Sequence, residues 1–269
     1  NLSDMNTLKE IERVIELEID ALIKLRKSLT KSYAQAIELL FNCSGKVVVT
    51  GMGKSGIVAQ KISATMASTG TSAVFLHSGD GMHGDVGMVS VGDVVIAISK
   101  SGQSDELLSI LRYIKKIRVP IIAITVSTDS ELVRVSDLVL VTPIDKEACP
   151  LDLVPTSSTT AALVVGDALA ITLMKMRGLT PEDFAVFHPG GQLGRRILTT
   201  VSDIMRAGLD NPVVNNKDSV QDMLYQITSK RSGAVSVIND QGVLLGLVTD
   251  FDIRRVIERE KDIFKLNVA

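Results

Sequence analysis

The sequence predicts an α/β protein: a five-stranded parallel sheet sandwiched by helices, followed by a small C-terminal α/β unit. Two observations lead to this prediction. Five short apolar runs alternate with helical stretches in the first two thirds of the chain. Strands that are apolar along their whole length are typical of parallel sheets covered by helices on both faces. After about residue 200, the strands and helices become shorter and the pattern changes.

The elements of the main sheet follow one another in order. Leu8 to Leu40 has apolar residues at helical spacing, which predicts one or two amphipathic helices. Strands are expected at Val47–Val49, Ala73–Leu76, Val94–Ile98, Ile121–Val126 and Leu138–Val141. Helices are expected at about Ser55–Ser68, Glu106–Ile117 and Thr156–Arg177, the last of them ended by Gly178.

A domain boundary is expected near Leu198 to Ser202, so the sequence divides into a helical arm (1–44), a main domain (45–198) and a C-terminal unit (201–269). The C-terminal strands are expected at Ala234–Ile238 and Leu245–Thr249. Its helices are expected at Val220–Ser229 and Asp252–Glu260. Because ligands of parallel α/β sheets bind at the carboxyl ends of the strands, the turns after Thr50, Leu76 and Ser99 are the places to look for function.

Composition excludes several functional classes. The 269 residues carry 29 basic and 31 acidic side chains, and this balance argues against nucleic acid or a membrane surface as the main partner. The absence of Trp argues against base stacking. The most apolar stretch, Thr160 to Met176, contains Asp167, and the N-terminus lacks a secretory pattern. Cys43 and Cys149 are too few for a disulfide framework or a zinc knuckle. We therefore expect a cytoplasmic protein.

The glycine-rich turn after the first strand matches two nucleotide motifs incompletely. Gly51, Gly53 and Gly56 have the G-x-G-x-x-G spacing of dinucleotide-binding folds, but the second strand ends without the expected acid, and Asp80 comes too late. A P-loop would need glycine at Val48. What both motifs share is a backbone that an anion can approach and a helix start that offers free N–H groups. Lys54 then adds a positive charge there, unless it is only a solvated turn residue.

A second turn carries hydroxyl groups. Ser99, Ser101 and Ser104, together with Gly102, lie between the third strand and the next helix, and this combination suits a phosphate monoester. The alternative is that Ser101 and Ser104 act only as capping and turn residues. Two anion-competent turns at one sheet edge favour the binding interpretation for both.

Titratable residues form a third group. The chain has three histidines, His77, His83 and His188, and it places Glu106 and Glu147 near the same turns. Carboxylates and histidines beside a phosphate site suit proton transfer next to a carbonyl. A metal site is the competing interpretation, but His77 and His83 lack a third ligand at metal-like spacing, so no metal and no cofactor are expected.

These motifs together resemble a known family. Residues 45–195 resemble the sugar isomerase (SIS) domain, and the motifs are similar to those of D-arabinose 5-phosphate isomerases. The motifs are Gly51–Gly56, Ser99–Ser104, Lys146–Pro150, Pro155–Thr160 and His188–Gly191. Residues 201–269 resemble one cystathionine-β-synthase (CBS) motif, from Ser202-Asp-Ile-Met205 to Gly246–Arg254.

The resemblance implies an activity and a set of site residues. Such enzymes interconvert D-ribulose 5-phosphate and D-arabinose 5-phosphate, and thereby supply the precursor of 3-deoxy-D-manno-octulosonate. The implied catalytic residues are Lys54, Glu106, Glu147, His188 and His83. The expected substrate-binding residues are Gly53, Ser55, Ser99, Ser101, Ser104, Thr156, Ser157, Ser158 and Thr159. The resemblance also implies a homotetramer whose subunits share active sites.

The sequence departs from the family pattern at three places. Gln103 stands where many members have Glu, and Gly81-Met82-His83 replaces an Ala-Ala-His. The family carries two CBS motifs, whereas this chain ends about where the second would begin, and it lacks an initiator Met. We therefore expect a shortened chain whose half CBS module has an apolar face that seeks another copy.

Two other functions compete with the isomerase as interpretations of these motifs. SIS domains also serve as sugar-phosphate sensors in transcription regulators, but residues 1–40 show acidic amphipathic helices rather than a basic helix-turn-helix. A dehydrogenase is disfavoured by the missing acid after the second strand. For the isomerase, Glu147 is the preferred base on carbon and Glu106 the alternative. Lys54 would stabilise the oxyanion, and His188, with His83, would move protons between oxygens.

Overall fold

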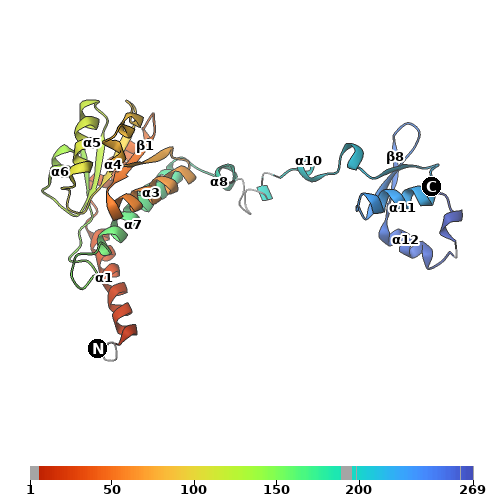
Figure 1. Ribbon diagram of the computed structural model, residues 1–269, viewed down its shortest axis with the longest axis horizontal. Helices are drawn as coiled ribbons and strands as arrows, with labels where there is room; N and C mark the ends of the chain where they lie inside the picture. Colours follow the sequence, from red (N-terminus) through yellow and green to blue (C-terminus); the bar gives the residue numbers. More distant parts are fainter. Residues whose placement is uncertain (1–5, 189–195, 198, 261, 269) are drawn as a thin grey trace. The chain divides into compact units, whose positions relative to one another are not determined.

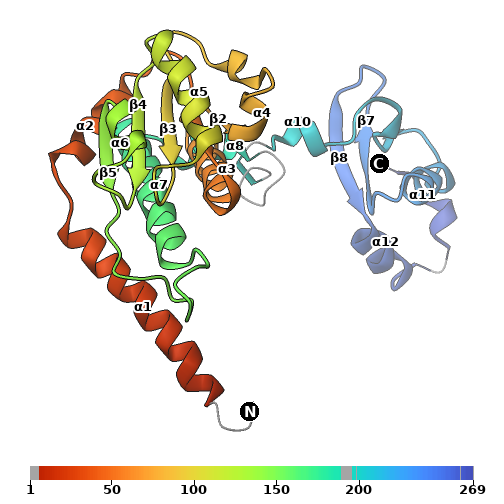
Figure 2. The ribbon, with the colours of Figure 1, turned by 60° about the vertical axis from the view of Figure 1, so that its left-hand side comes forward.

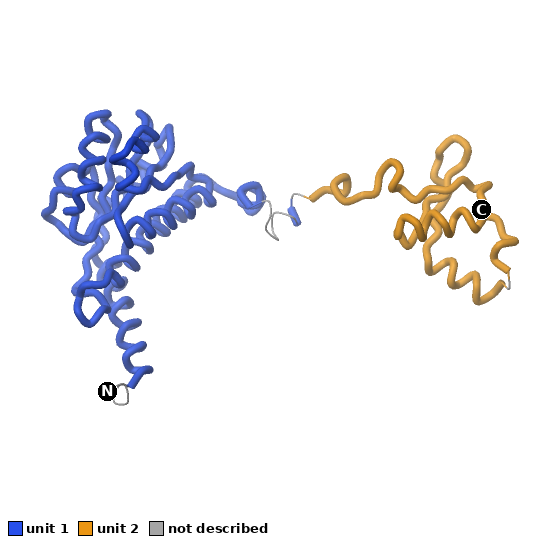
Figure 3. Tube along the Cα trace, in the orientation of Figure 1, with its two compact units in different colours: residues 1–198 blue, residues 199–269 orange. Residues whose placement is uncertain are grey.

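The computed structural model describes residues 6–188, 196–197, 199–260 and 262–268 (Figure 1). The chain divides into two compact units, residues 1–198 and 199–269 (Figure 3), and each unit is described by itself.

The first unit is built on a five-stranded parallel sheet, which confirms the predicted fold class. The strand order is β2-β1-β3-β4-β5. The strands are β1 (Val47–Gly51), β2 (Ala73–His77), β3 (Val94–Ile98), β4 (Ile121–Thr125) and β5 (Leu138–Val141). All run the same way, so their carboxyl ends lie along a single edge of the sheet.

Helices cover both faces of this sheet (Figure 2). They are α1 (Thr7–Lys27), α2 (Lys31–Phe41), α3 (Gly53–Ser68), α4 (Ser78–Gly81), α5 (Asp105–Lys116), α6 (Glu131–Val135), α7 (Ser157–Met176) and α8 (Pro181–Phe187), with a 3-10 helix, η1 (Asp85–Met88). Along β1, Val47 and Val49 pack towards α2, α3 and α7, whereas Val48 packs towards α5 and α6. This alternation explains why the strands are apolar throughout.

Helices α3 and α7 lie against each other on one face of the sheet (Figure 1). Their contact is close because Gly166 has no side chain: a Cβ there would lie 2.3 Å from Cδ1 of Ile62. Within the described residues, α7 is the one helix that is long and apolar enough to cross a membrane, with a mean hydropathy of 1.4 over its most apolar window. Half of that window is buried inside the unit, as in a core helix.

The structure differs from the predicted elements mainly in the short segments. The helices α4, α6 and α8 and the 3-10 helix η1 were not predicted, because each is less than two turns long and carries little periodic signal. Helix α3 begins at Gly53 rather than Ser55. Gly53 itself has a φ of +56°, a left-handed conformation that glycine adopts without strain.

The second unit contains a three-stranded mixed sheet, in the order β6-β7-β8, as expected for a small α/β unit. Its elements are α10 (Val201–Ile204), η2 (Gly208–Asp210), β6 (Val213–Asn215), α11 (Val220–Ser229), β7 (Ala234–Ile238), β8 (Leu244–Thr249), α12 (Asp250–Ile257) and η3 (Ile263–Lys265). Its core packs α11 against β6 and β7, through residues such as Met223, Ile227 and Val235. Strand β6 was not predicted, because it has only three residues.

Candidate active site

A small cleft lies at the carboxyl edge of the parallel sheet. Several segments of the first unit meet there: the start of α3, the loop after β3, the ends of β4 and β5, and the start of α7. Its polar lining consists of Ser55, Lys100, Thr125, Thr142, Ser158 and Thr159. The cleft therefore lies where the sequence predicts a ligand, although Lys100, Thr125 and Thr142 were not among the predicted site residues.

The glycines of the first turn have two different roles. Gly51 and Gly56 allow β1 and α3 to approach each other, since a Cβ on Gly56 would lie 2.9 Å from the Gly51 carbonyl oxygen. Gly53 supplies the positive φ of the turn, and a Cβ there would meet nothing within 4 Å. Lys54 follows in the first turn of α3; it is exposed and has no ion-pair partner among the described residues.

The hydroxyl-rich loop between β3 and α5 is closed by its own hydrogen bonds. The N–H of Gly102 donates to Ser99 Oγ at 3.1 Å, and the N–H of Gln103 donates to Ser101 Oγ at 3.3 Å. These hydrogen bonds are typical of turn residues, which is the alternative that the sequence left open for Ser101. Ser104 differs: it stands at the N-cap position of α5, yet its hydroxyl makes no capping bond. The Ser104 hydroxyl lies 3.4 Å from Ser99 Oγ and remains able to bind a further group.

Glu147 is the most completely bonded side chain of the site. Its carboxylate is buried, and one oxygen, Oε2, accepts hydrogen bonds from the N–H groups of Thr156 (2.8 Å) and Ser158 (3.1 Å). The other oxygen, Oε1, accepts from Ser158 Oγ at 2.5 Å and lies 2.7 Å from Lys100 Nζ. Glu147 therefore caps α7 from the loop that precedes the helix, whereas the side chain of Thr156, at the N-cap position, makes no capping bond.

Electrostatics follow from this geometry. Burial alone would raise the pKa of Glu147, but the Lys100 ammonium, the Ser158 hydroxyl and the N–H groups of Thr156 and Ser158 lower it to about 2. The carboxylate is thus an anion at every physiological pH. Lys100 is one of the site residues that the sequence did not indicate. It lies between Ser99 and Ser101, which were expected to bind through their hydroxyl groups. Its partner Glu147 is far away in the sequence, so no short motif links the two residues.

Glu106 lies in the first turn of α5, two residues after Ser104, and is half-buried. Within the described part of the chain, its carboxylate has no hydrogen-bond or ion-pair partner. The two glutamates predicted as catalytic therefore occupy contrasting environments: Glu147 is enclosed and fully bonded, and Glu106 is unengaged.

Among the described residues, no histidine forms a hydrogen bond or an ion pair with Glu106 or Glu147. His83 is exposed in the turn after α4, and His77 Nδ1 lies 3.6 Å from the Asp80 carboxylate. His188 is held by its own helix: its Nδ1 is 2.9 Å from the Phe184 carbonyl oxygen, and its ring stacks on Phe184. The remainder of the His188 motif, residues 189–191, lies outside the described residues. The described residues contain no cluster of three or more metal-ligating side chains.

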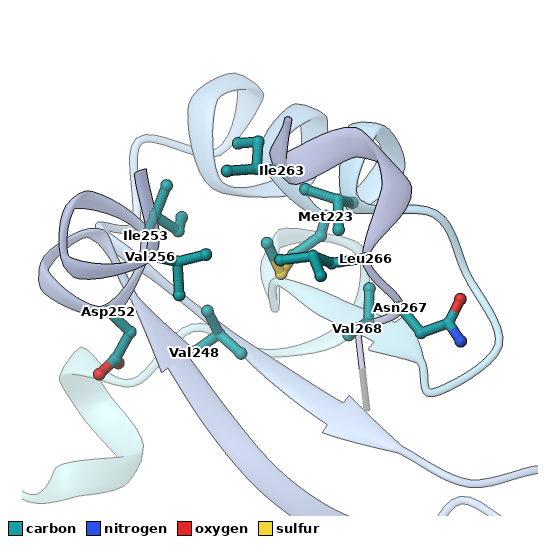
Figure 4. Close-up of a pocket in the computed structure, with 10 residues that line it drawn as sticks. Met223, Val248, Asp252, Ile253, Val256, Ile263, Leu266, Asn267 and Val268 are labelled. Carbon is teal, nitrogen blue, oxygen red and sulfur yellow. The ribbon is translucent and has the colours of Figure 1, made fainter. Parts of the chain in front are cut away.

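A second cavity belongs to the C-terminal unit (Figure 4). Apolar side chains dominate its wall, among them Met223, Val248 and Ile253. Its one acidic side chain, Asp252, caps α12 by accepting from the N–H and the hydroxyl of Thr249. Among the described residues, no cluster of polar groups aimed at a ligand lines this cavity, so the cleft at the sheet edge is the better candidate for chemistry.

The fold and the cleft define a sugar isomerase (SIS) domain joined to a CBS domain. A model of the SIS domain matches residues 40–172, and a model of the CBS domain matches residues 201–259. Arabinose 5-phosphate isomerase KdsD of Salmonella typhimurium (strain LT2) is 48% identical over 96% of this chain and 79% of its own length. The chain belongs to the arabinose 5-phosphate isomerase family.

Solved structures agree with this assignment. The Escherichia coli CFT073 protein c3406, in complex with arabinose 5-phosphate, is 41% identical with a TM-score of 0.67, and the match covers 69% of this chain and 99% of that protein. The sugar isomerase domain of an RpiR transcription factor from Sphaerobacter thermophilus has a TM-score of 0.56 at 21% identity, covering 65% of this chain and 93% of that one. This second likeness shows the fold alone.

Proposed function

We propose that this chain is an aldose–ketose isomerase that interconverts D-ribulose 5-phosphate and D-arabinose 5-phosphate. The observation that carries the proposal is the meeting of anion-binding groups and carboxylates at one edge of the sheet. The cleft there is lined by hydroxyl groups from α7 and by Lys100. Lys54 and Glu106 extend from the first turns of α3 and α5, which begin at the same edge. Membership of the arabinose 5-phosphate isomerase family supports the choice of substrate.

The phosphate is proposed to bind between the loop after β3 and the start of α7. The hydroxyl of Ser157, the first residue of α7, is buried and has no hydrogen-bond partner among the described residues. Burying a hydroxyl without a hydrogen bond is unfavourable, so the Ser157 hydroxyl is a candidate donor at the start of α7. Ser101 and Ser104 are proposed to supply further hydroxyl groups, because the hydroxyls of Ser158 and Thr159 already donate to Glu147 and to the Thr156 carbonyl oxygen. The N-terminal end of the 20-residue helix α7 favours an anion.

The reaction needs one base that works on carbon. Starting from the ketose, the base removes a proton from C1, and the electrons form an enediolate with its charge on O2. The hydroxyl proton of O1 then moves to O2, and C2 takes a proton to give the aldose. Lys54 is proposed to stabilise the oxyanion, and His188, with His83, to carry the proton between the two oxygens.

Glu106, rather than Glu147, is proposed as the base on carbon. An effective base has a pKa near the operating pH and a free lone pair. Glu147 has a pKa of about 2, and both of its oxygens are hydrogen-bonded. Glu106 is unengaged in the described part of the chain. This reverses the order of preference that the sequence suggested.

The test is turnover of ribulose 5-phosphate in D₂O with excess chelator, followed by NMR. Deuterium at C2 of the arabinose product supports the proton-transfer route. Activity that is lost to the chelator, without deuterium in the product, would support a metal-assisted hydride shift instead. Tight binding without conversion would favour a sugar-phosphate sensor.

We also propose that the protein works in the cytoplasm as a homotetramer. Helix α1 presents an exposed apolar stripe at helical spacing, formed by Leu8, Ile11, Ile15, Ile19 and Ile23. Such a stripe supports association with another copy. Light scattering at working concentration tests the assembly, and a monomer would contradict it.

A further inference from the structure

The ion pair between Lys100 and Glu147 connects two segments that are far apart in the sequence. Lys100 belongs to the hydroxyl-rich loop after β3, and Glu147 caps the start of α7. These are the two segments proposed above to hold the phosphate. The pair is therefore a direct link between the two sides of the anion site.

We propose that Lys100 is a positioning residue, whose ion pair with Glu147 sets the spacing between the loop after β3 and the start of α7 and so forms one phosphate site from two segments. The inference rests on the proposed function, because it assigns a role within that phosphate site. Neither the sequence motifs nor the hydroxyl pattern of the loop indicated it.

Both members of the pair are held in place by further bonds. The carbonyl oxygen of Lys100 accepts from Thr125 Oγ1 at 3.2 Å, which ties the loop to the end of β4. On the other side, the N–H of Glu147 donates to the Asp152 carboxylate at 2.6 Å, and the N–H of Ala148 donates to Thr156 Oγ1 at 2.8 Å. Because both ends are anchored, a change at the ion pair is transmitted to the loop and to α7.

Charge gives the pair a second effect. A carboxylate already occupies the N-terminal end of α7, and an unpaired anion there would repel a phosphate dianion. The Lys100 ammonium neutralises Glu147 and so removes this repulsion. The Lys100 side chain is 39% exposed at the cleft, whereas that of Glu147 is completely buried. Lys54 has no ion-pair partner among the described residues, so its ammonium can interact with the oxygen atoms of the sugar.

The experiment uses Lys100→Met and Lys100→Arg in the full chain. We expect Lys100→Met to raise both the KM for ribulose 5-phosphate and the Kd for inorganic phosphate about 10- to 100-fold, with a smaller effect on kcat. Lys100→Arg should restore most of the affinity, because the guanidinium can also pair with the carboxylate. The matched control is Lys61→Met, which removes an exposed ion pair between α3 and Asp167 of α7 and should leave both constants unchanged.

The pH profile separates positioning from a merely structural role. Without Lys100, the buried Glu147 loses its cationic partner and its pKa rises, so the acidic limb of kcat/KM should move to higher pH in Lys100→Met. A pair that contributes only to folding would lower Tm and leave this limb in place. If Lys100→Met folds poorly, the double variant Lys100→Met/Glu147→Gln removes both charges; it should recover most of the stability but not the phosphate affinity.

Calorimetric titration with inorganic phosphate distinguishes failure of this inference from failure of the proposed function. If the parent protein binds phosphate in a Lys100-dependent way but does not isomerise ribulose 5-phosphate, the proposed function is wrong and the positioning role stands. If the parent protein isomerises the sugar, and folded Lys100→Met retains its KM, phosphate Kd and pH profile, the positioning role is overturned.

Discussion

The guanidinium group of Arg13 on α1 donates a hydrogen bond to the carbonyl oxygen of Ala148, at 3.0 Å. Ala148 follows Glu147 directly, so the N-terminal helix contacts the segment that caps α7. Two further contacts run along the same helix: Lys24 pairs with Asp145, and Thr160 Oγ1 donates to the Glu18 carboxylate at 2.7 Å. Helix α1 is therefore a support for the active-site segment as well as an arm.

Replacement of Arg13 by Ala should weaken this support. We expect kcat/KM to fall about 2- to 10-fold and the free energy of unfolding to fall slightly, because one hydrogen bond is lost. Steady-state kinetics and urea denaturation measure the two effects. Arg134→Ala, which removes an exposed pair with Asp129, is the control. Equal effects in the two variants would contradict a specific role for Arg13.

Replacement of Glu106 by Gln should mainly affect kcat, whereas replacement of Glu147 by Gln should mainly affect Tm. Glu106→Gln should lower kcat by about 10²-fold or more without changing Tm, since it removes a base that has no partner among the described residues. Glu147→Gln should lower Tm clearly, because it leaves the Lys100 ammonium without its partner. Kinetics and thermal unfolding of both variants provide the measurement. A near-normal kcat for Glu106→Gln would return the role of base to Glu147.

Stability should depend on the ionisation of Glu147 in acid. Its folded pKa of about 2 lies below the ordinary glutamate value of 4.5, so the stabilisation is complete above about pH 4.5 and is lost as the pH falls towards 2. The shift corresponds to about 3 kcal/mol. Denaturant unfolding at pH 7, 4 and 3 should show the difference between parent and Glu147→Gln shrinking in acid. A constant difference across this range would contradict the lowered pKa.

Gly102→Ala should damage the phosphate site. Gly102 has a φ of +66°, and a Cβ there would lie 2.2 Å from Ser130 Oγ, so both the backbone and the neighbouring segment would have to move. We expect a loss of about 1–3 kcal/mol in stability and a weaker affinity for inorganic phosphate. Gly178→Ala is the matched control, with a φ of +67° and open space around the added Cβ. Equal losses in both variants would show that only the backbone conformation matters.

Sequence alone predicted the sheet well because its signal is local. The strands β1, β3, β4 and β5 are short apolar runs rich in β-branched residues, and the structure places their bounds within two residues of the prediction. Short elements such as α4 and β6 were missed, since three or four residues carry no clear period.

Of the expected substrate-binding residues, Ser55, Ser158 and Thr159 line the cleft, but the connections between its segments were not predicted. The glycine turn, the hydroxyl loop and Glu147 could be found because each is a local motif. The pairing of Lys100 with Glu147 depends on residues that the order of the strands brings together. The capping of α7 by Glu147 depends on the conformation of the loop between β5 and α7. Periodicity in the sequence does not indicate either contact.

The close contact of Gly166 with Ile62 also restricts how α3 and α7 can move relative to each other. Close-packed helices without intervening side-chain space transmit displacement instead of absorbing it. We therefore expect α3 and α7 to move as one body, with Lys54 and Ser157 at a constant separation throughout a catalytic cycle. Any opening that admits the sugar then has to come from the connecting loops, and hydrogen exchange should be fast there and slow along both helices.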